Sequence, residues 1–332
     1  MKPFTLLVKP VGGACNLGCR YCFYNSHPGG RIDTGLLERA IDSYCALPFD
    51  DSLKYIALQG GEPLLAPARV LDIIASKPVQ RAIQTNATLV TPELAARFKE
   101  EGWLAGVSLD GPRDIHDAMR SGSFDAAVRG IRNLEDAGAD YNLMCVVSQA
   151  NVRRGKEVYR FLRDNFNTRF QQYIECTGPV ASLAVSGEEW GSFLVDVFDE
   201  WIERDMREIS VRLFDSVVSQ ILRGWPTQCS FMKECREHLV LEYDGSVYPC
   251  DFFVEKELCL GNIAGKGWAE MVSGDVYGRF ACRKSFNSMC ADCEWVDFCN
   301  GDCPRNRYSL CRGWKRFFAR AVPELAARLL TI

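Results

Sequence analysis

The chain has 332 residues, which is long enough for one large α/β unit with an appended module. Its 47% hydrophobic and 25% charged residues are typical of a globular protein and exclude disordered, collagenous and low-complexity classes. With a formal net charge of −4 it has no broad basic surface, so we expect no nucleic-acid partner. No apolar run is long enough for a membrane span, and residues 1–10 do not read as a signal peptide, so we expect no membrane partner and a cytoplasmic location.

The chain contains 16 cysteines, far more than a reducing compartment favours unless the thiols bind metal. Three lie close together near the amino end, and ten lie between Cys229 and Cys311. The remaining Cys45, Cys145 and Cys176 are isolated in apolar or helical runs, and we interpret them as small buried hydrophobes. The uneven distribution predicts two metal-binding regions rather than a disulfide framework.

The first group is Cys15, Cys19 and Cys22, with spacing CxxxCxxC in a glycine-containing loop. Three thiolates do not complete a tetrahedral zinc site, for which His27 is the nearby fourth candidate, whereas a four-iron cluster held by three cysteines leaves one iron open. The motif, followed by Phe23 and Tyr24, resembles the signature of the radical S-adenosylmethionine (SAM) superfamily. The resemblance implies a [4Fe-4S] cluster on these three cysteines, with SAM bound at the open iron.

As far as about residue 180, short apolar runs alternate with helical stretches, which predicts parallel βα units. The predicted strands are 4–8, 55–59, 82–85, 105–109, 142–147 and 171–174. The predicted helices are 34–47, 92–101, 124–137 and 152–165. Six such units predict an α/β fold with a partial (β/α)6 TIM-like barrel of the radical SAM type. Polar residues at the carboxyl ends of its strands would meet on one face.

Several predicted strands run directly into polar or glycine-containing segments. The glycines of Gly60-Gly61-Glu62-Pro63 allow close backbone approach, and the Glu62 carboxylate can accept from an ammonium group. The family resemblance implies a SAM site formed by Gly60, Gly61, Glu62, Gln84, Asn86, Ser108 and Asp110, with Arg120 as a further candidate for the SAM carboxylate. The alternative for Ser108 and Asp110 is that they are ordinary turn formers.

Two amphipathic helices are predicted between residues 187 and 223, and a cysteine-rich module follows. The module resembles the SPASM extension of radical SAM peptide-modifying enzymes, which implies two auxiliary [4Fe-4S] clusters and three clusters in all. The implied ligands are Cys229, Cys235, Cys250 and Cys303 for the first auxiliary cluster and Cys290, Cys293, Cys299 and Cys311 for the second. Cys259 and Cys282 are left over as structural residues, with the alternative that either replaces one of these ligands, and zinc ribbons are the alternative for the CxxC spacing. The predicted divisions are a barrel at 1–185, a helical linker at 186–228, and a SPASM domain with a C-terminal helix at 229–332.

Within SPASM proteins the chain looks closest to the anaerobic sulfatase-maturating enzymes, through residues 247–254, 260–262 and 299–307. That resemblance implies radical oxidation of a cysteine or serine in a protein or peptide substrate to formylglycine. It also implies that Asp251 is the base, with Gln59 and Tyr24 near the substrate. A base beside the electron acceptor has a physical rationale, because a carbon radical bearing OH or SH becomes a stronger reductant once that group loses its proton.

Two alternatives remain. The chain departs from the family pattern at residues 174–178 and in a tight segment between Cys303 and Cys311, so a SPASM enzyme that forms a thioether or other crosslink in a ribosomal peptide is the second hypothesis. A non-catalytic iron-sulfur carrier or zinc-stapled binding protein is the third, but it gives the polar strand ends no purpose. We expect a flavodoxin or ferredoxin as electron donor, and a monomer.

Overall fold

The structure, a computed structural model, describes residues 1–178, 180–306 and 308–329. Arg307 and the last three residues of the predicted C-terminal domain lie outside the described residues. The strands within this part are β1 (Thr5–Lys9), β2 (Tyr55–Leu58), β3 (Gln80–Thr85), β4 (Trp103–Ser108), β5 (Tyr141–Val147), β6 (Phe170–Glu175), β7 (Ser210–Val211), β8 (His238–Glu242), β9 (Ser246–Tyr248) and β10 (Gly261–Asn262). They form one sheet in the order β10-β9-β8-β1-β2-β3-β4-β5-β6-β7.

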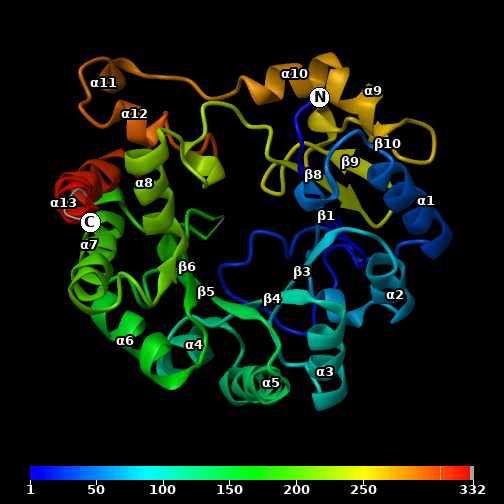
Figure 1. Ribbon diagram of the computed structural model, residues 1–332, viewed down its shortest axis with the longest axis horizontal. Coiled ribbons are helices and arrows are strands. Elements are labelled where there is room, and N and C mark those ends of the chain that lie inside the picture. The colour runs from blue at the N-terminus through cyan, green and yellow to red at the C-terminus, as the bar shows by residue number, and fades with distance from the viewer. Residues whose placement is uncertain (179, 307, 330–332) are drawn as a thin grey trace.

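Helices cover the outside of this sheet (Figure 1). Those before the cysteine-rich module are α1 (Thr34–Cys45), α2 (Arg69–Ala75), α3 (Pro92–Glu101), α4 (Arg113–Met119), α5 (Phe124–Ala137), α6 (Gly155–Asn165), α7 (Gly187–Arg204) and α8 (Arg212–Arg223). Those after it begins are α9 (Trp268–Ser273), α10 (Asp275–Ala281), α11 (Ser288–Ala291), α12 (Val296–Cys299) and α13 (Cys311–Leu329). The helices α1 to α6 each follow or precede a parallel strand, which is the βα order of a partial barrel.

All six predicted strands are present as β1 to β6, with ends that differ by at most two residues, and the predicted fold class is confirmed. The predicted helices 92–101 and 124–137 match α3 and α5, because each ends at a left-handed glycine, Gly102 or Gly138. Helix α6 begins three residues later than predicted, since the backbone at Asn151–Arg154 first forms a hydrogen-bonded turn. Helices α7 and α8 confirm the amphipathic pair expected between residues 187 and 223.

The sheet extends beyond the six barrel strands at both edges. Strand β7 adds to β6, and β8 pairs in parallel with β1, with Lys9 opposite Glu242 in the register. Because β8 follows residue 229, the sheet crosses the predicted boundary of the third domain, and the domain limits themselves remain a prediction. The pairing brings the cysteine-rich module against the first barrel strand.

Helix α13 packs closely on α7 through glycines. A Cβ atom added to Gly313 would lie 2.2 Å from the carbonyl oxygen of Gly187, so the two backbones meet with no side chain between them. The aromatic stripe predicted as core on α7 is buried, and Trp190 packs edge-on against Trp314 of α13. This contact fixes the start of α13, and therefore the position of Cys311.

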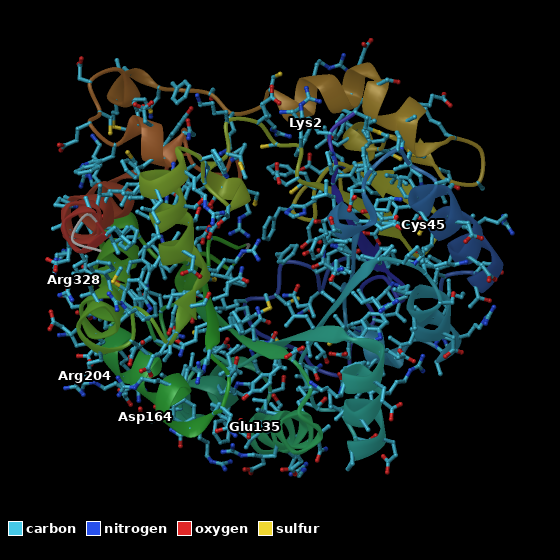
Figure 2. The ribbon with its side chains drawn as sticks, in the orientation of Figure 1. Lys2, Cys45, Glu135, Asp164, Arg204 and Arg328 are labelled. Carbon is cyan, nitrogen blue, oxygen red and sulfur yellow. The ribbon has the colours of Figure 1, made fainter. Side chains whose placement is uncertain are left out.

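The isolated cysteines largely behave as expected. Cys145 and Cys176 are buried, while Cys45 is half-buried at the end of α1, in the outer helical layer (Figure 2). Of the two left-over cysteines, Cys282 is exposed and Cys259 is half-buried. In the part of the chain that the structure describes, no helix is both long and apolar enough to cross a bilayer.

Candidate active site

A cavity of about 470 Å³ opens where the carboxyl ends of the barrel strands meet the cysteine-rich module. Every predicted site residue lies in the described part of the chain, and most of them line this cavity. They are Cys15, Cys19, Cys22, Tyr24, Gln59, Gly60, Gly61, Glu62, Gln84, Asn86, Ser108, Arg120, Cys229, Cys235, Cys250, Asp251 and Cys303. The structure therefore gathers residues from both ends of the sequence around one space, as expected for an active site.

The loop that carries the first three cysteines is held at its sulfur atoms as well as along its backbone. The Cys15 sulfur accepts from the backbone N–H of Leu17 at 3.4 Å, and the Cys19 sulfur accepts from Nη1 of Arg120 at 3.9 Å. Burial raises the pKa of Cys15 and Cys19, so their thiolates need a compensating cation. Three partly buried thiols with N–H donors on two of them fit a metal cluster held by three cysteines.

The glycines after β2 serve this loop. The Gly61 N–H donates to the carbonyl oxygen of Gly12 at 2.8 Å, and the Glu62 N–H donates to that of Ala14 at 2.9 Å. Gly60 has a φ of +121°, which side-chain-bearing residues rarely adopt. The two glycines therefore bring the end of β2 against the cysteine loop. The sequence predicted a close backbone approach here, but to a ligand rather than to this loop.

We expect Gly61→Ala to weaken this junction. A Cβ atom at Gly61 would lie 1.9 Å from the Ala14 carbonyl oxygen, so the strand end and the loop would have to separate. The expected cost is about 1–3 kcal/mol in the free energy of unfolding, typical of overpacking, together with a lower iron content. Urea unfolding and iron analysis would measure both. Gly267→Ala is the matched control, because nothing lies within 4 Å of a Cβ there, and a Gly61→Ala protein as stable as this control would contradict the expectation.

Glu62 lies at the centre of the strand-end residues. Its carboxylate accepts from Thr85 Oγ1 at 2.8 Å, from the Asn86 N–H at 2.9 Å and from the Leu64 N–H at 3.1 Å. Burial raises the pKa of Glu62, because a 1% exposed carboxylate has lost its water. Asn86 in turn donates to Asn16 Oδ1 at 2.9 Å in the cysteine loop. A fixed, desolvated carboxylate beside the cysteines fits the ammonium group of an amino-acid-like ligand.

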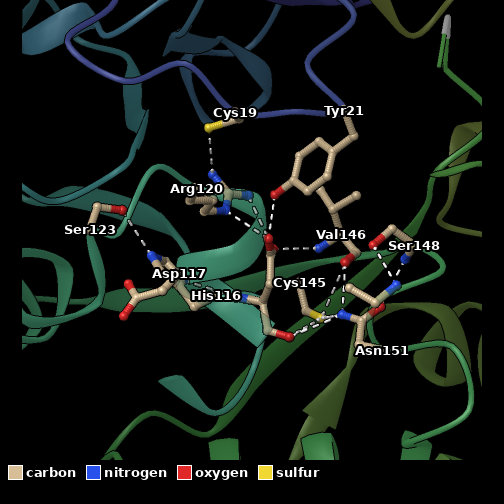
Figure 3. A network of polar contacts seen from close by, with 12 residues as sticks. Cys19, Tyr21, His116, Asp117, Arg120, Ser123, Cys145, Val146, Ser148 and Asn151 are labelled. Carbon is tan, nitrogen blue, oxygen red and sulfur yellow. Dashed lines mark hydrogen bonds and ion pairs between the residues drawn. The ribbon is translucent and has the colours of Figure 1, made fainter. Parts of the chain in front are cut away.

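Asp110 is the predicted residue that lies behind the cavity wall rather than on it, and its side chain is fully buried. Arg120 Nε donates to one of its carboxylate oxygens at 2.9 Å, and Arg120 Nη2 donates to the other at 3.2 Å. The backbone N–H of Val146 donates to this carboxylate at 3.0 Å, and the Tyr21 hydroxyl donates to it as well. Figure 3 shows Tyr21, Arg120 and Val146, the three donors of these bonds, pointing toward one another. Asp110 thus reaches the cavity through Arg120, and its assignment to the SAM site stays a prediction.

Asp251 faces the cavity with its carboxylate bound to Lys9. The Lys9 side chain is 1% exposed, forms an ion pair with Asp251, and lies 3.8 Å from Glu242 Oε1. The Tyr24 hydroxyl donates to both Glu242 oxygens at 2.6 and 2.7 Å, and the Lys9 ammonium lies 3.4 Å from the centroid of the Tyr24 ring. In the described structure the buried Gln59 Nε2 has no hydrogen-bond partner. The three predicted catalytic residues therefore line one space, and Gln59 offers it a donor.

Sequence reasoning missed Lys9 and Glu242. Each is a charged residue that follows three apolar residues at the end of a strand, β1 or β8, and the two stand opposite each other in the parallel register. The available signal was an apolar run that ends in a charged residue, and it occurs once in β1 and once in β8. That signal was ambiguous, because a charge at a strand end is usually solvated.

The cysteines of the third region separate into two sets. Cys229 is close enough to Cys235, Cys250 and Cys303 for the thiolate charges to repel. Burial raises the pKa of Cys303 to about 12, with further contributions from the Asp302 carboxylate and from Cys229. All four line the main cavity. This set matches the ligands implied for the first auxiliary cluster.

The second set surrounds a smaller cavity of about 20 Å³ between α11, α12 and the start of α13. Its lining includes Cys290, Cys293, Cys299 and Cys311, which are the ligands implied for the second auxiliary cluster. Burial raises the pKa of Cys299 to about 12, with a further contribution from Asp302.

The two segments where the chain departs from the family pattern contact each other at the cavity. Arg305 Nη2 donates to the carbonyl oxygen and to Oε1 of Glu175, both at 3.3 Å, and Asn306 Nδ2 donates to the same Oε1 at 3.0 Å. The Arg305 guanidinium stacks on Phe252 at 3.8 Å from the ring centroid, and Phe252 follows Asp251 directly in the chain. The end of β6 and the loop after Cys303 thus form one continuous part of the cavity rim.

Comparisons with known proteins agree with this geometry. The sequence model of the Radical SAM superfamily matches residues 10–162, and that of SPASM, an iron-sulfur cluster-binding domain, matches residues 229–294. The serine-type anaerobic sulfatase-maturating enzyme of Bacteroides thetaiotaomicron is 32% identical over 98% of this chain and 91% of that protein. The cysteine-type enzyme of Clostridium perfringens strain 13 is 29% identical over 98% of both chains.

The likeness extends to three dimensions. A solved structure of native anSMEcpe with bound AdoMet and a Cp18Cys peptide superposes with a TM-score of 0.92 at 29% identity, and covers 99% of both chains. The sequence likeness to the Bacteroides enzyme runs along nearly the entire length of each protein. The chain therefore belongs to the anaerobic sulfatase-maturating enzymes of the radical SAM superfamily.

Proposed function

We propose that this chain oxidises the Cβ of a serine or cysteine in a peptide substrate to formylglycine. The relatives that it matches are named for sulfatase maturation, in serine and cysteine types. The observation that carries the proposal is one cavity lined both by Cys15, Cys19 and Cys22 and by the Lys9–Asp251 ion pair. A two-electron oxidation needs a radical source and a proton acceptor within reach of the same carbon atom.

The residues present fit SAM and its cluster. Cys15, Cys19 and Cys22 would hold the cluster, Glu62 would accept from the SAM ammonium, and Arg120 has free N–H donors for the SAM carboxylate. When bound, SAM and the three [4Fe-4S] clusters supply a radical that removes one hydrogen atom from Cβ and an acceptor for one electron. The chain's own side chains then have two tasks, namely to hold the substrate side chain and to take its proton.

Asp251 takes that proton in the proposed reaction. A serine side chain that loses a hydrogen atom from Cβ, a proton from its hydroxyl and one electron becomes the aldehyde of formylglycine. A cysteine side chain becomes a thioaldehyde, and water then replaces its sulfur with release of hydrogen sulfide. The Lys9 ammonium fixes one carboxylate oxygen, and the side chain keeps 19% exposure in the cavity, so the carboxylate is both oriented and accessible.

The peptide substrate tests the proposal directly. Reconstituted enzyme with SAM and a reductant would be incubated with two sulfatase-type peptides that differ only in serine or cysteine at the target position. Mass spectrometry should show loss of two hydrogens from serine, or exchange of the cysteine SH₂ for oxygen. A peptide in which cysteine loses hydrogen but keeps its sulfur would instead support thioether formation, and SAM cleavage without any change in either peptide would reject the proposal.

We further infer that a reduced flavodoxin or ferredoxin delivers the electron that starts the reaction, since low-potential clusters need a low-potential donor. The enzyme would act as a monomer in the cytoplasm, where thiols stay reduced and available for iron. Pull-down of a flavodoxin by the enzyme, with electron transfer followed by absorbance, would check the donor.

A further inference from the structure

The segment after α4 holds the cysteine loop from one side. The backbone N–H of Arg20 donates to the Met119 carbonyl oxygen at 2.9 Å, and the Gly18 N–H donates to Ser121 Oγ at 3.2 Å. Between these two attachments, Arg120 Nη1 donates to the Cys19 sulfur at 3.9 Å. Two backbone anchors and one side-chain donor thus meet the loop at the middle cysteine of the CxxxCxxC motif.

Arg120 is unusually well fixed for a side chain that faces a cavity. Its side chain is 8% exposed, and two of its nitrogens grip the fully buried Asp110 carboxylate at 2.9 and 3.2 Å. Asp110 is itself held by the Tyr21 hydroxyl and the Val146 N–H (Figure 3). Because the Nε and Nη2 atoms of the planar guanidinium are held by Asp110, the direction of the third nitrogen, Nη1, is fixed, and it points toward the Cys19 sulfur.

We propose that Arg120 is a positioning residue for Cys19, and that its guanidinium raises the reduction potential of the cluster at Cys15, Cys19 and Cys22. Reduction adds one negative charge to the cluster. A nearby cation and an N–H donor on a ligand sulfur stabilise that added charge. Asp110 binds the Nε and Nη2 atoms, on the side of the guanidinium away from Cys19, so the positive group lies between the Cys19 sulfur and the Asp110 carboxylate.

This inference rests on the proposed cluster, but it does not depend on peptide oxidation. It also differs from the expected role of Arg120 toward the SAM carboxylate, for which two of its N–H donors stay free. The two roles make different predictions in the absence of SAM. A donor on Cys19 acts on the cluster at all times, whereas a carboxylate ligand acts only when SAM is bound.

The test is a redox titration of the reconstituted enzyme, followed by EPR. The EPR signal of the cluster at Cys15, Cys19 and Cys22 is identified as the one that Cys15→Ala lacks, and its midpoint potential is measured. In Arg120→Met we expect a more negative midpoint potential with and without SAM, and in Arg120→Lys a smaller shift in the same direction. Arg113→Met is the matched control, because Arg113 begins helix α4, which Arg120 follows, has a 55% exposed side chain and pairs with Asp125 at the surface. Its potential should equal that of the wild type.

An unchanged potential without SAM in Arg120→Met would overturn the inference, and a shift seen only with SAM would assign Arg120 to the SAM carboxylate instead. If Arg120→Met does not assemble this cluster, Arg120→Lys carries the measurement, and a wild-type potential there overturns the inference. Failure of the sulfatase-type peptides to react would leave these potentials unaffected, so the two proposals can fail separately.

Discussion

Replacing Cys15 by alanine is expected to abolish both SAM cleavage and peptide oxidation. Three cysteines are the minimum that holds a four-iron cluster with one open iron, and no other cysteine lies next to this loop in the sequence. The Cys15 sulfur is tied in place by the Leu17 N–H and by Asn86 Nδ2, at 3.4 and 3.9 Å, so its loss also removes contacts that order the loop. The effect should be the largest of any single substitution in the barrel.

The measurement combines iron content with product analysis. Three [4Fe-4S] clusters hold about twelve irons per chain, so a loss of about four irons in Cys15→Ala would mean that the change is confined to one cluster. Release of 5′-deoxyadenosine and formation of the oxidised peptide, both followed by mass spectrometry, should fall below detection. Cys282→Ala is the matched control, because Cys282 is exposed and is assigned to no cluster, and it should keep full iron and activity. SAM cleavage at the wild-type rate in Cys15→Ala would remove the proposed cluster from this loop.

A companion substitution separates the two ends of the chain. Cys290→Ala should lower the iron content by a similar amount while SAM cleavage continues, since Cys290 belongs to the set around the smaller cavity. Equal loss of SAM cleavage in the two variants would mean that the cysteine sets depend on each other for folding. The start of α13 offers a physical route, because Cys311 of the same set is positioned by the backbone contact of α13 with α7.

Most of the barrel could be predicted from the sequence because its strands and its longer helices carry local signals, whereas the short helices α2 and α4 were not predicted. Helix α3 starts at the Thr91 cap with Pro92 in its first turn and stops at a left-handed Gly102, and these signals gave its bounds without any tertiary information. The cysteine spacing was equally local, since CxxxCxxC and the CxxC at Cys290 each lie within one loop. Local patterns, together with the family resemblance that they carry, therefore predicted the cysteines and the polar strand ends of the cavity but not the rest of its lining.

Contacts between distant segments could not be predicted in this way. The pairing of β1 with β8 joins residues more than 200 positions apart, so neither Lys9 nor Glu242 carried a sign of the other. Asp110, in contrast to Lys9 and Glu242, was predicted as a site residue, because its position at a strand end predicts a place on the active face. The structure turns its carboxylate inward to Arg120, and only the geometry distinguishes these two arrangements.

The second large effect is expected from Asp251→Asn, which should uncouple SAM cleavage from peptide oxidation. The amide has the shape of the carboxylate but accepts no proton at neutral pH, and it leaves Glu242 as the carboxylate that pairs with the buried Lys9 ammonium. Loss of a positioned base typically costs about 10²–10⁴-fold in rate. Hydrogen abstraction from Cβ precedes the need for the base, so 5′-deoxyadenosine should still form.

A substrate deuterated at the target Cβ distinguishes this uncoupling from a damaged site. In Asp251→Asn, deuterium should still appear in 5′-deoxyadenosine while formylglycine falls by the factor above, because the substrate remains bound beside the radical. Glu255→Gln makes the same carboxylate-to-amide change at an exposed residue of the same segment and should retain full oxidation. Undiminished oxidation in Asp251→Asn would transfer the role of base to another group, and Glu242, which lies 3.8 Å from the Lys9 ammonium, would be the next residue to replace.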